Sequence, residues 1–303
     1  MEHYYSLNKY LRCQFGCKVY KLALDGGFTC PNRDGSIDFR GCIFCSGSGS
    51  GDFSVPVGSD IAGAIKAAED VVSGKSSSGK FIAYFQSFTG TYAPVSRLRE
   101  LYSAVIAHPD IVALSIGTRP DCLGDDIIEL LAELNKIKPV WIELGLQTIH
   151  KSTAEYIRRG YELEVFDSAV RRLKSAKIGV IVHMIIGLPG ESDDMIYQTA
   201  EYIGRSGADG IKLQLLHILQ GTDLAADYSS GRFSALTLEK YIELLEGCIQ
   251  RLPESIVIHR LTGDGAKRDL IAPLWSADKK RTLNAINQAF ERDCIKQGAL
   301  FSP

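Results

Sequence analysis

The sequence predicts an α/β fold, a partial (β/α)6 barrel of the TIM type with a C-terminal extension. Short β-branched runs alternate along the chain with longer amphipathic stretches, which is typical of repeated βα units around a parallel sheet. The chain has 303 residues, and eight complete units followed by an extension would need more. A Rossmann sheet is the ordinary alternative. The glycine-rich phosphate-binding pattern that such a sheet carries is missing after the first predicted strand.

The elements follow in order from these patterns. The runs rich in β-branched residues predict strands at Val19–Leu24, Phe81–Phe85, Val112–Gly117, Val140–Gly145, Val180–Ile186, Gly210–Leu216 and Ile256–Arg260. The stretches between them predict helices at Ile61–Val72, Val95–Ala107, Asp125–Asn135, Lys151–Ile157, Glu164–Ala176, Asp193–Ser206 and Leu238–Arg251. Ser59 or Asp60 is the expected N-terminal cap of the helix at Ile61–Val72. The segment Leu11–Cys17 is a further candidate for an amphipathic helix. Residues 1–228 are expected to form the barrel and residues 229–303 an α-rich extension packed on it.

Composition restricts the partners. Hydrophobic residues make up 45% of the chain and charged residues 23%, as in ordinary globular proteins. The net charge of -2 gives no bulk basic field for a nucleic-acid backbone, which weighs mildly against a large RNA substrate and predicts no DNA partner. No signal peptide or membrane-spanning run is expected, so the cytoplasm is the expected location.

The central signal is a group of three cysteines after the first strand. Eleven residues separate Cys30 from Cys42, and two separate Cys42 from Cys45. Thiolates are the ligands that iron–sulfur clusters and zinc both prefer. A structural zinc site needs four ligands, and the nearest additional cysteines, Cys13 and Cys17, come before that strand. Three ligands would leave one iron open for a substrate, and the loop lies where barrel enzymes place their chemistry.

Several segments together resemble one family. They are Ala23–Phe28, Cys30–Gly35, Ala83–Gln86, Thr118–Leu123, Glu143–Thr148 and His259–Gly265. With the cysteine loop, they resemble the radical S-adenosylmethionine superfamily, and within it a small bacterial family similar to the radical domain of the elongator catalytic subunit. The long first cysteine gap also occurs in that branch.

The resemblance implies a [4Fe–4S] cluster on Cys30, Cys42 and Cys45, and S-adenosylmethionine as the second cofactor. It implies that reductive cleavage of S-adenosylmethionine yields a radical that takes a hydrogen atom from the substrate. A flavodoxin or ferredoxin would supply the electron. The residues that the resemblance places around S-adenosylmethionine are Phe44, Gln86, Ser87, Thr89, Ser115, Glu143, Gln147 and Arg159.

The resemblance also suggests the reaction. Two related activities break a carbon–nitrogen bond and leave an aminomethyl group on a nucleobase. One is queuine lyase, which acts on a free deazaguanine base, and the other acts on carboxymethylaminomethyl-uridine at the wobble position of tRNA. Departures from the family pattern near strand ends, such as Gln214, and the mildly acidic balance favour free queuine, a small molecule. The candidate substrate contacts are Asp25, Tyr84, Asp121, His183, Gln214, His217, Arg260 and Asp264.

Two other interpretations stay open. The cysteines could belong to a zinc or cluster-bearing binding module without catalysis. Radical methylthio-transfer is the second, although the remaining cysteines form no evident second cluster motif. Cys122 is expected to be buried rather than to quench a radical.

Overall fold

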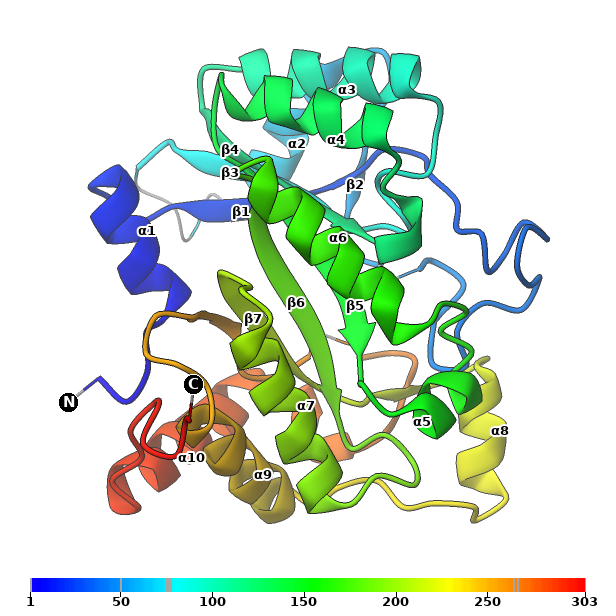
Figure 1. Cartoon of the computed structure of the whole chain (residues 1–303), viewed down its shortest axis with the longest axis vertical. Coiled ribbons are helices and arrows are strands. Elements are labelled where there is room, and N and C mark those ends of the chain that lie inside the picture. Colours follow the sequence, from blue (N-terminus) through cyan, green and yellow to red (C-terminus); the bar gives the residue numbers. More distant parts are fainter. Residues whose placement is uncertain are drawn as a thin grey trace.

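The protein is built around one large parallel sheet. The computed structural model describes residues 2–49, 51–72, 74, 78–263, 265 and 267–302. Its eight-stranded sheet has the order β2-β1-β3-β4-β5-β6-β7-β9, and every neighbouring pair is parallel (Figure 1). The strands are β1 (Tyr20–Asp25), β2 (Val55–Pro56), β3 (Phe81–Phe85), β4 (Ile111–Thr118), β5 (Val140–Gln147), β6 (Gly179–Ile186), β7 (Gly210–Leu215) and β9 (Val257–Arg260). This is the predicted α/β fold, a partial barrel.

The helices between the strands confirm the predicted alternation. They are α2 (Ile61–Val72), α3 (Val95–Ala107), α4 (Asp125–Asn135), α5 (Lys151–Tyr156), α6 (Leu163–Ser175), α7 (Asp193–Arg205), α8 (Asp223–Ser229) and α9 (Leu238–Gln250). Asp60 caps α2, because its Oδ1 accepts a hydrogen bond from the Gly63 amide at 2.8 Å. Asp125 and Asp126 stand in the first turn of α4, where acids are favourable.

Two elements, α1 (Leu7–Phe15) and β5, differ from the prediction by more than one residue at an end. The first helix, α1, begins and ends earlier than expected, because Ser6 caps its start and Gly16 adopts a left-handed conformation with φ 71° at its end. Strand β5 continues two residues beyond Gly145, since Gln147 still pairs with Met184 after an irregularity in the register.

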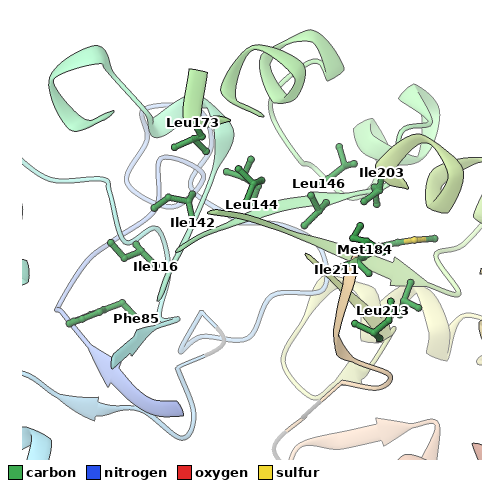
Figure 2. Close-up of a cluster of buried hydrophobic side chains, with 14 of the residues drawn as sticks. Phe85, Ile116, Ile142, Leu144, Leu146, Leu173, Met184, Ile203, Ile211 and Leu213 are labelled. Carbon is green, nitrogen blue, oxygen red and sulfur yellow. The ribbon is translucent and has the colours of Figure 1, made fainter. Parts of the chain in front are cut away.

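The outer face of the sheet carries the hydrophobic core. Side chains that alternate along the strands pack there against the covering helices, as period 2 requires for a strand. Figure 2 shows this arrangement for Phe85, Ile116, Ile142, Leu144, Leu146, Met184, Ile211 and Leu213, with Leu173 of α6 and Ile203 of α7. All of these side chains are buried.

The inner face of the sheet is layered from apolar to polar. Its lowest layer, near the N-terminal ends of the strands, is a second apolar cluster that contains Val19, Ile82, Ala113, Trp141 and Ile181. Two residues further along each strand, a polar layer follows, formed by Lys21, Tyr84, Ser115, Glu143, His183 and Lys212. The next positions include Gly117 on β4 and Gly145 on β5, which leave this level of the barrel open. The barrel is therefore closed at one end and open at the other.

The C-terminal part of the chain packs beside the barrel and also contributes to its sheet. Strand β9 pairs with β7, and α10 (Lys279–Arg292) lies beside α9 (Figure 1). A separate two-stranded sheet joins β8 (Ile218–Leu219) to β10 (Leu270–Ala272). The two ends of the chain meet, because the Gln297 amide donates to the His3 carbonyl at 3.0 Å. Among the described residues, no helix is both long and apolar enough to cross a membrane.

Candidate functional site

One cavity opens at the C-terminal ends of the strands, the end at which barrel enzymes carry their active sites. Its walls combine the cysteine loop after β1 with residues from β3 to β9. They include Cys30, Cys42, Phe44, Cys45, Tyr84, Gln86, Thr89, Glu143, Gln147, Arg159, His183, Lys212, Gln214 and Arg260. The structure thus brings together most of the residues that the sequence singled out.

The three cysteines of the loop line this cavity together. Cys30, Cys42 and Cys45 are half-buried and free of disulfides. Burial and the neighbouring Cys45 thiol raise the pKa of Cys42 to about 12, and burial raises the pKa of Cys45. The thiols of Cys42 and Cys45 are therefore protonated in the absence of a metal, and coordination would displace their protons.

Backbone contacts fix the cysteine loop to two other elements. The Ile43 amide donates to the Ile157 carbonyl at the end of α5, and the Leu224 amide of α8 donates to the Ile43 carbonyl, both at 3.1 Å. Asn32 Nδ2 lies 3.5 Å from Cys42 Sγ and donates to the Arg158 carbonyl at 2.8 Å. These contacts tie the cysteine loop to α5 and α8.

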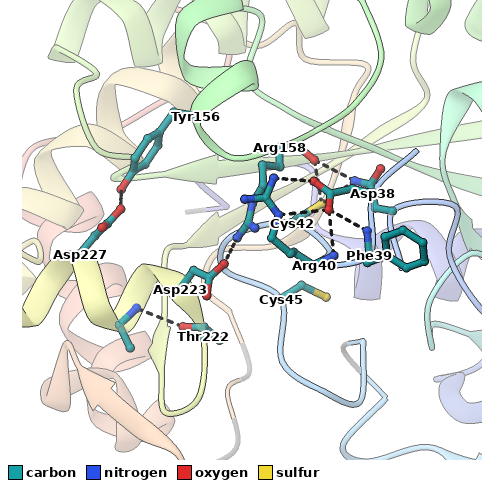
Figure 3. A network of polar contacts seen from close by, with 12 residues as sticks. Asp38, Phe39, Arg40, Cys42, Cys45, Tyr156, Arg158, Thr222, Asp223 and Asp227 are labelled. Atoms are coloured by element: carbon teal, nitrogen blue, oxygen red, sulfur yellow. Dashed lines mark hydrogen bonds and ion pairs between the residues drawn. The ribbon is translucent and has the colours of Figure 1, made fainter. Parts of the chain in front are cut away.

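Figure 3 shows Arg158 beside Cys42 and reaching α8. Its guanidinium bonds the Asp223 carboxylate at 2.5 Å, and its carbonyl oxygen lies 3.7 Å from Cys42 Sγ. The backbone of Arg158 has φ 57°, a conformation that non-glycine residues rarely adopt. This conformation aims the carbonyl at the cysteine loop.

The donor set fits an iron–sulfur cluster better than a zinc ion. In the described part of the chain, no three His, Cys, Asp or Glu side chains are arranged to hold one metal ion. The three thiols surround a shared cavity instead. Cys13 and Cys17 lie in and just after α1, which precedes β1 and lies at the other end of the barrel. They therefore do not complete a four-cysteine zinc site.

The predicted S-adenosylmethionine contacts also include Phe44 in the cysteine loop and a segment that directly follows β3. Phe44, Gln86 and Thr89 line the cavity. The Oγ of Ser87 is buried and has no hydrogen-bond partner among the described residues. A buried polar atom without a partner is uncommon, but Ser87 is not among the residues that line the cavity.

Gln147 and Arg159 form the opposite side of the opening. Gln147 has φ 64°, and strained backbone of this kind is concentrated at functional sites. The Arg159 guanidinium is buried and donates to the carbonyls of Thr148 at 2.6 Å and Tyr161 at 2.9 Å. It also lies 4.5 Å from the centre of the Tyr161 ring. These contacts hold the guanidinium rigidly at the cavity wall.

Glu143 lies at the centre of the polar layer. Its Oε1 accepts hydrogen bonds from Lys21 Nζ at 2.5 Å and Ser115 Oγ at 2.7 Å. Its Oε2 accepts one from His183 Nε2 at 2.7 Å and bonds Lys212 Nζ. Four donors from four strands thus converge on one carboxylate with 1% of its surface exposed.

The charges in this layer set its protonation. Burial alone would raise the pKa of Glu143, but the charges of Lys21 and Lys212, with the hydrogen bond from His183, hold it well below its usual range. Burial lowers the pKa of Lys212 despite the partnership with Glu143. Burial and the Lys212 charge lower the pKa of His183 to about 4. The layer therefore contains an ionised glutamate and a neutral histidine at pH 7.

The predicted substrate contacts divide into two groups. Tyr84, His183, Gln214 and Arg260 line the cavity. Asp121 is bound by Arg119 at 2.9 and 2.7 Å, and with Cys122 it borders a different hollow. His217 lines a neighbouring groove, and Asp25 accepts a hydrogen bond from the Gly27 amide at 2.9 Å. Asp264 lies outside the described residues.

Several cations of the site were not among the predicted contacts. Lys21 and Lys212 meet at Glu143, and their ammonium groups lie 4.5 and 4.4 Å from the centre of the Tyr84 ring. Arg33 donates to the Cys45 and Ser46 carbonyls at 3.0 and 2.6 Å, beside the cysteines. Alternation along the strands contained the signal for the lysines, because each stands at an inward position of its strand.

Comparison with known proteins identifies the family. The Radical SAM superfamily model matches residues 38–203, and the Radical SAM C-terminal domain model matches residues 208–292. The Bacillus subtilis (strain 168) protein YtqA is 43% identical over 300 residues, which is 99% of this chain and 93% of YtqA. A Methanocaldococcus jannaschii tRNA uridine(34) acetyltransferase is 28% identical over 156 residues, 50% of this chain and 28% of that protein. The structure of an N-terminally truncated Methanocaldococcus infernus Elp3 has the same fold, with a TM-score of 0.71. The two sequences are 17% identical, and the match covers 92% of this chain and 64% of that Elp3 chain. The chain therefore belongs to the radical S-adenosylmethionine superfamily, whose enzymes use a [4Fe–4S] cluster and S-adenosylmethionine.

Proposed function

We propose that the protein is a radical S-adenosylmethionine lyase that breaks a carbon–nitrogen bond of a modified nucleobase and leaves an aminomethyl group on the base. One observation carries the proposal. The cysteine loop and the polar layer around Glu143 face the same cavity, so a cofactor on the cysteines and a substrate on the polar layer would meet there. The bound cluster and S-adenosylmethionine supply the radical chemistry.

The roles of the chain's own residues follow from their positions. Cys30, Cys42 and Cys45 hold the cluster, and Asn32 and Arg33 restrain the loop around them. Phe44, Gln86, Thr89, Gln147 and Arg159, which line the cavity, would hold S-adenosylmethionine above the polar layer. Arg159 would donate a charge-assisted hydrogen bond to the carboxylate of that cofactor. The apolar cluster below the polar layer keeps water out of the closed end of the barrel.

The charge balance of the cavity narrows the substrate class. The described lining residues include the cations Arg33, Arg119, Arg159, Lys212 and Arg260, but Glu143 is their one carboxylate. Asp121, which lies outside the cavity, forms an ion pair with Arg119 and balances its charge. A cationic cavity of this kind attracts anionic groups and disfavours a substrate that is purely cationic.

Carboxymethylaminomethyl-uridine in tRNA suits this balance, because its aminomethyl nitrogen carries an anionic carboxymethyl group. The nitrogen would stay on the base after the reaction. Relatives support an RNA substrate, since one of them is named a tRNA uridine(34) acetyltransferase. Free queuine, which the sequence favoured, has an amine and no carboxylate. It stays the second candidate, because the Gln214 amide in the cavity offers both a donor and an acceptor to the edge of a base.

A groove beside the cavity supports the larger substrate. It is lined by Lys267, Arg268 and Lys279, together with apolar residues of β1 and α2. Lys21 connects the groove with the polar layer, because it lines the groove and bonds Glu143 inside the barrel. A polynucleotide backbone held along the groove would have its modified base directed toward the polar layer.

The test compares the two substrates directly. The protein is reconstituted anaerobically with iron and sulfide and reduced in the presence of S-adenosylmethionine, with flavodoxin or dithionite as the electron donor. It is then given either tRNA bearing carboxymethylaminomethyl-uridine or free queuine. Mass spectrometry follows deoxyadenosine and the modified base. Aminomethyl-uridine in the tRNA confirms the first candidate, and aminomethyl-deazaguanine confirms the second. Deoxyadenosine with neither product contradicts the proposed reaction.

A variant of the groove separates the two cases further. Lys267→Ala combined with Arg268→Ala removes two cations from the groove and none from the cavity. We expect weaker tRNA binding and a smaller dependence of that binding on salt concentration. Turnover of a free base should be unaffected by the same change.

A further inference from the structure

His183 occupies an unusual place among the residues of the polar layer. It is on β6, between Glu143 on β5 and Lys212 on β7. Its ring lines the cavity, and 19% of its side chain is exposed there. One ring nitrogen, Nε2, lies 2.7 Å from Glu143 Oε2. The other, Nδ1, makes no hydrogen bond to the described residues.

The neighbours of His183 determine which ring nitrogen carries the proton. Glu143 accepts hydrogen bonds and cannot donate while it is ionised, so Nε2 must be the donor. A second proton on Nδ1 would place another positive charge beside Lys21, Lys212 and Arg260, which face the same layer. The ring is therefore neutral, with hydrogen on Nε2 and a lone pair on Nδ1.

We infer that Glu143 is a positioning residue that locks His183 in the Nε2–H tautomer, so that Nδ1 accepts a hydrogen bond from the N–H group of the substrate in the cavity. The inference rests on the proposed function, because both candidate substrates carry an amine next to the bond that is broken. It replaces the expected contact of Glu143 with S-adenosylmethionine, since four donors already occupy both carboxylate oxygens.

The arrangement also explains why the glutamate is surrounded by two lysines. In an isolated Glu143–His183 pair, the carboxylate would favour uptake of a proton from water by the ring, and an imidazolium would form. The charges of Lys21 and Lys212 stabilise the ionised carboxylate and disfavour a protonated ring. Together they keep the acceptor nitrogen unprotonated in the physiological range.

Nitrogen-15 NMR of the histidine rings tests the tautomer without any turnover. The chain has six histidines, and the spectrum of His183→Gln assigns the signal. Spectra are recorded on the cluster-loaded protein and on metal-free protein, in which no cluster broadens the signal. We expect a neutral Nε2–H ring from pH 8 down to about pH 6, and loss of this single tautomer in Glu143→Gln. An imidazolium or an Nδ1–H ring at pH 7 would overturn the inference, whichever substrate proves correct.

Two substitutions test the role of Nδ1. The glutamine amide introduced by His183→Gln can still donate to Glu143, but it leaves no acceptor where Nδ1 was. His183→Asn does the reverse, because its shorter amide reaches the Nδ1 position and not Glu143. We expect His183→Gln to raise the substrate KM about tenfold, the usual scale of one lost hydrogen bond, and His183→Asn to raise it less. A merely structural histidine would give the opposite order.

His108→Gln is the matched control, because His108 lies at the end of α3 and outside the cavity. We expect its kinetic constants to equal those of the unchanged protein. If neither substrate reacts with the unchanged protein, the proposed function fails while the NMR result still decides the tautomer. If a substrate reacts and His183→Gln has an unchanged KM, the inference about Nδ1 is wrong.

Discussion

Replacement of Glu143 by glutamine tests the electrostatic account of the polar layer. The change removes a negative charge and keeps the shape of the side chain. Lys212, with 4% of its side chain exposed, then has no anionic partner among the described residues of the barrel interior, while Lys21 is 19% exposed and can turn toward water. Removal of one partner from a buried ion pair typically costs about 3–5 kcal/mol.

We expect the lower end of that range, about 3 kcal/mol, for two reasons. The amide oxygen of glutamine still accepts one hydrogen bond from the layer. Lys212 can also lose its proton, because burial already lowers its pKa and the carboxylate that opposed this effect is gone. Urea unfolding at pH 7 provides the measurement, through the shift of the midpoint at constant slope.

The matched control is Glu133→Gln, the same chemical change in an ion pair with Arg99 at the surface. It should leave the unfolding midpoint unchanged, because exposed pairs contribute little. A double variant, Glu143→Gln with Lys212→Met, should recover part of the loss by removing the uncompensated charge. Equal midpoints for Glu143→Gln and Glu133→Gln would refute the reasoning.

Three further predictions follow from the site. Cys42→Ala should abolish iron–sulfur loading, measured by iron and sulfide content, whereas Cys13→Ala on the exposed face of α1 should load normally. A His183 pKa of about 4 in the folded state, below the usual 6.5, means that the unfolded chain binds a proton first as pH falls. Stability should therefore fall by about 2 kcal/mol between pH 7 and pH 5, and urea titrations of His183→Gln should show a loss smaller by that amount. Gln147→Gly should keep the unfolding midpoint, since glycine relieves the strain at φ 64°. Calorimetry of the same variant should show weaker binding of S-adenosylmethionine, and unchanged binding would contradict the assigned contact.

The fold could be predicted largely from the sequence because its strands carry strong local signals. The run at Phe81–Phe85 is a strand with the predicted bounds, and α2, α3 and α4 also match. Short elements carried no such signal. Strand β2 has two residues and β10 has three, so their pairing depends on contacts with distant segments of the chain. The ends of α1 are set by Ser6, which caps the first turn, and by Gly16, which ends the helix in a left-handed conformation. Serine and glycine are also common in loops, so neither residue marks a helix end by itself.

The site was predictable where residues are close in sequence and less so where they meet through the sheet. The cysteine loop is one segment, so its three thiols were expected to converge. The polar layer joins residues from different strands, and Lys21 is 122 residues from Glu143. The inward direction of a side chain follows from period 2, but its partner depends on the register between strands. Glu143 was therefore expected near S-adenosylmethionine, but its burial and its four donors could not be predicted.

The most direct test of the account is the reductive cleavage of S-adenosylmethionine by the anaerobically reconstituted protein. We expect reduced protein to release deoxyadenosine and methionine, and the triple variant Cys30→Ala, Cys42→Ala, Cys45→Ala to release neither. Cleavage by the triple variant at the rate of the unchanged protein would show that the cluster is held elsewhere. An absence of cleavage by fully loaded, reduced, unchanged protein with substrate present would contradict the central claim that this cavity unites the cluster with S-adenosylmethionine.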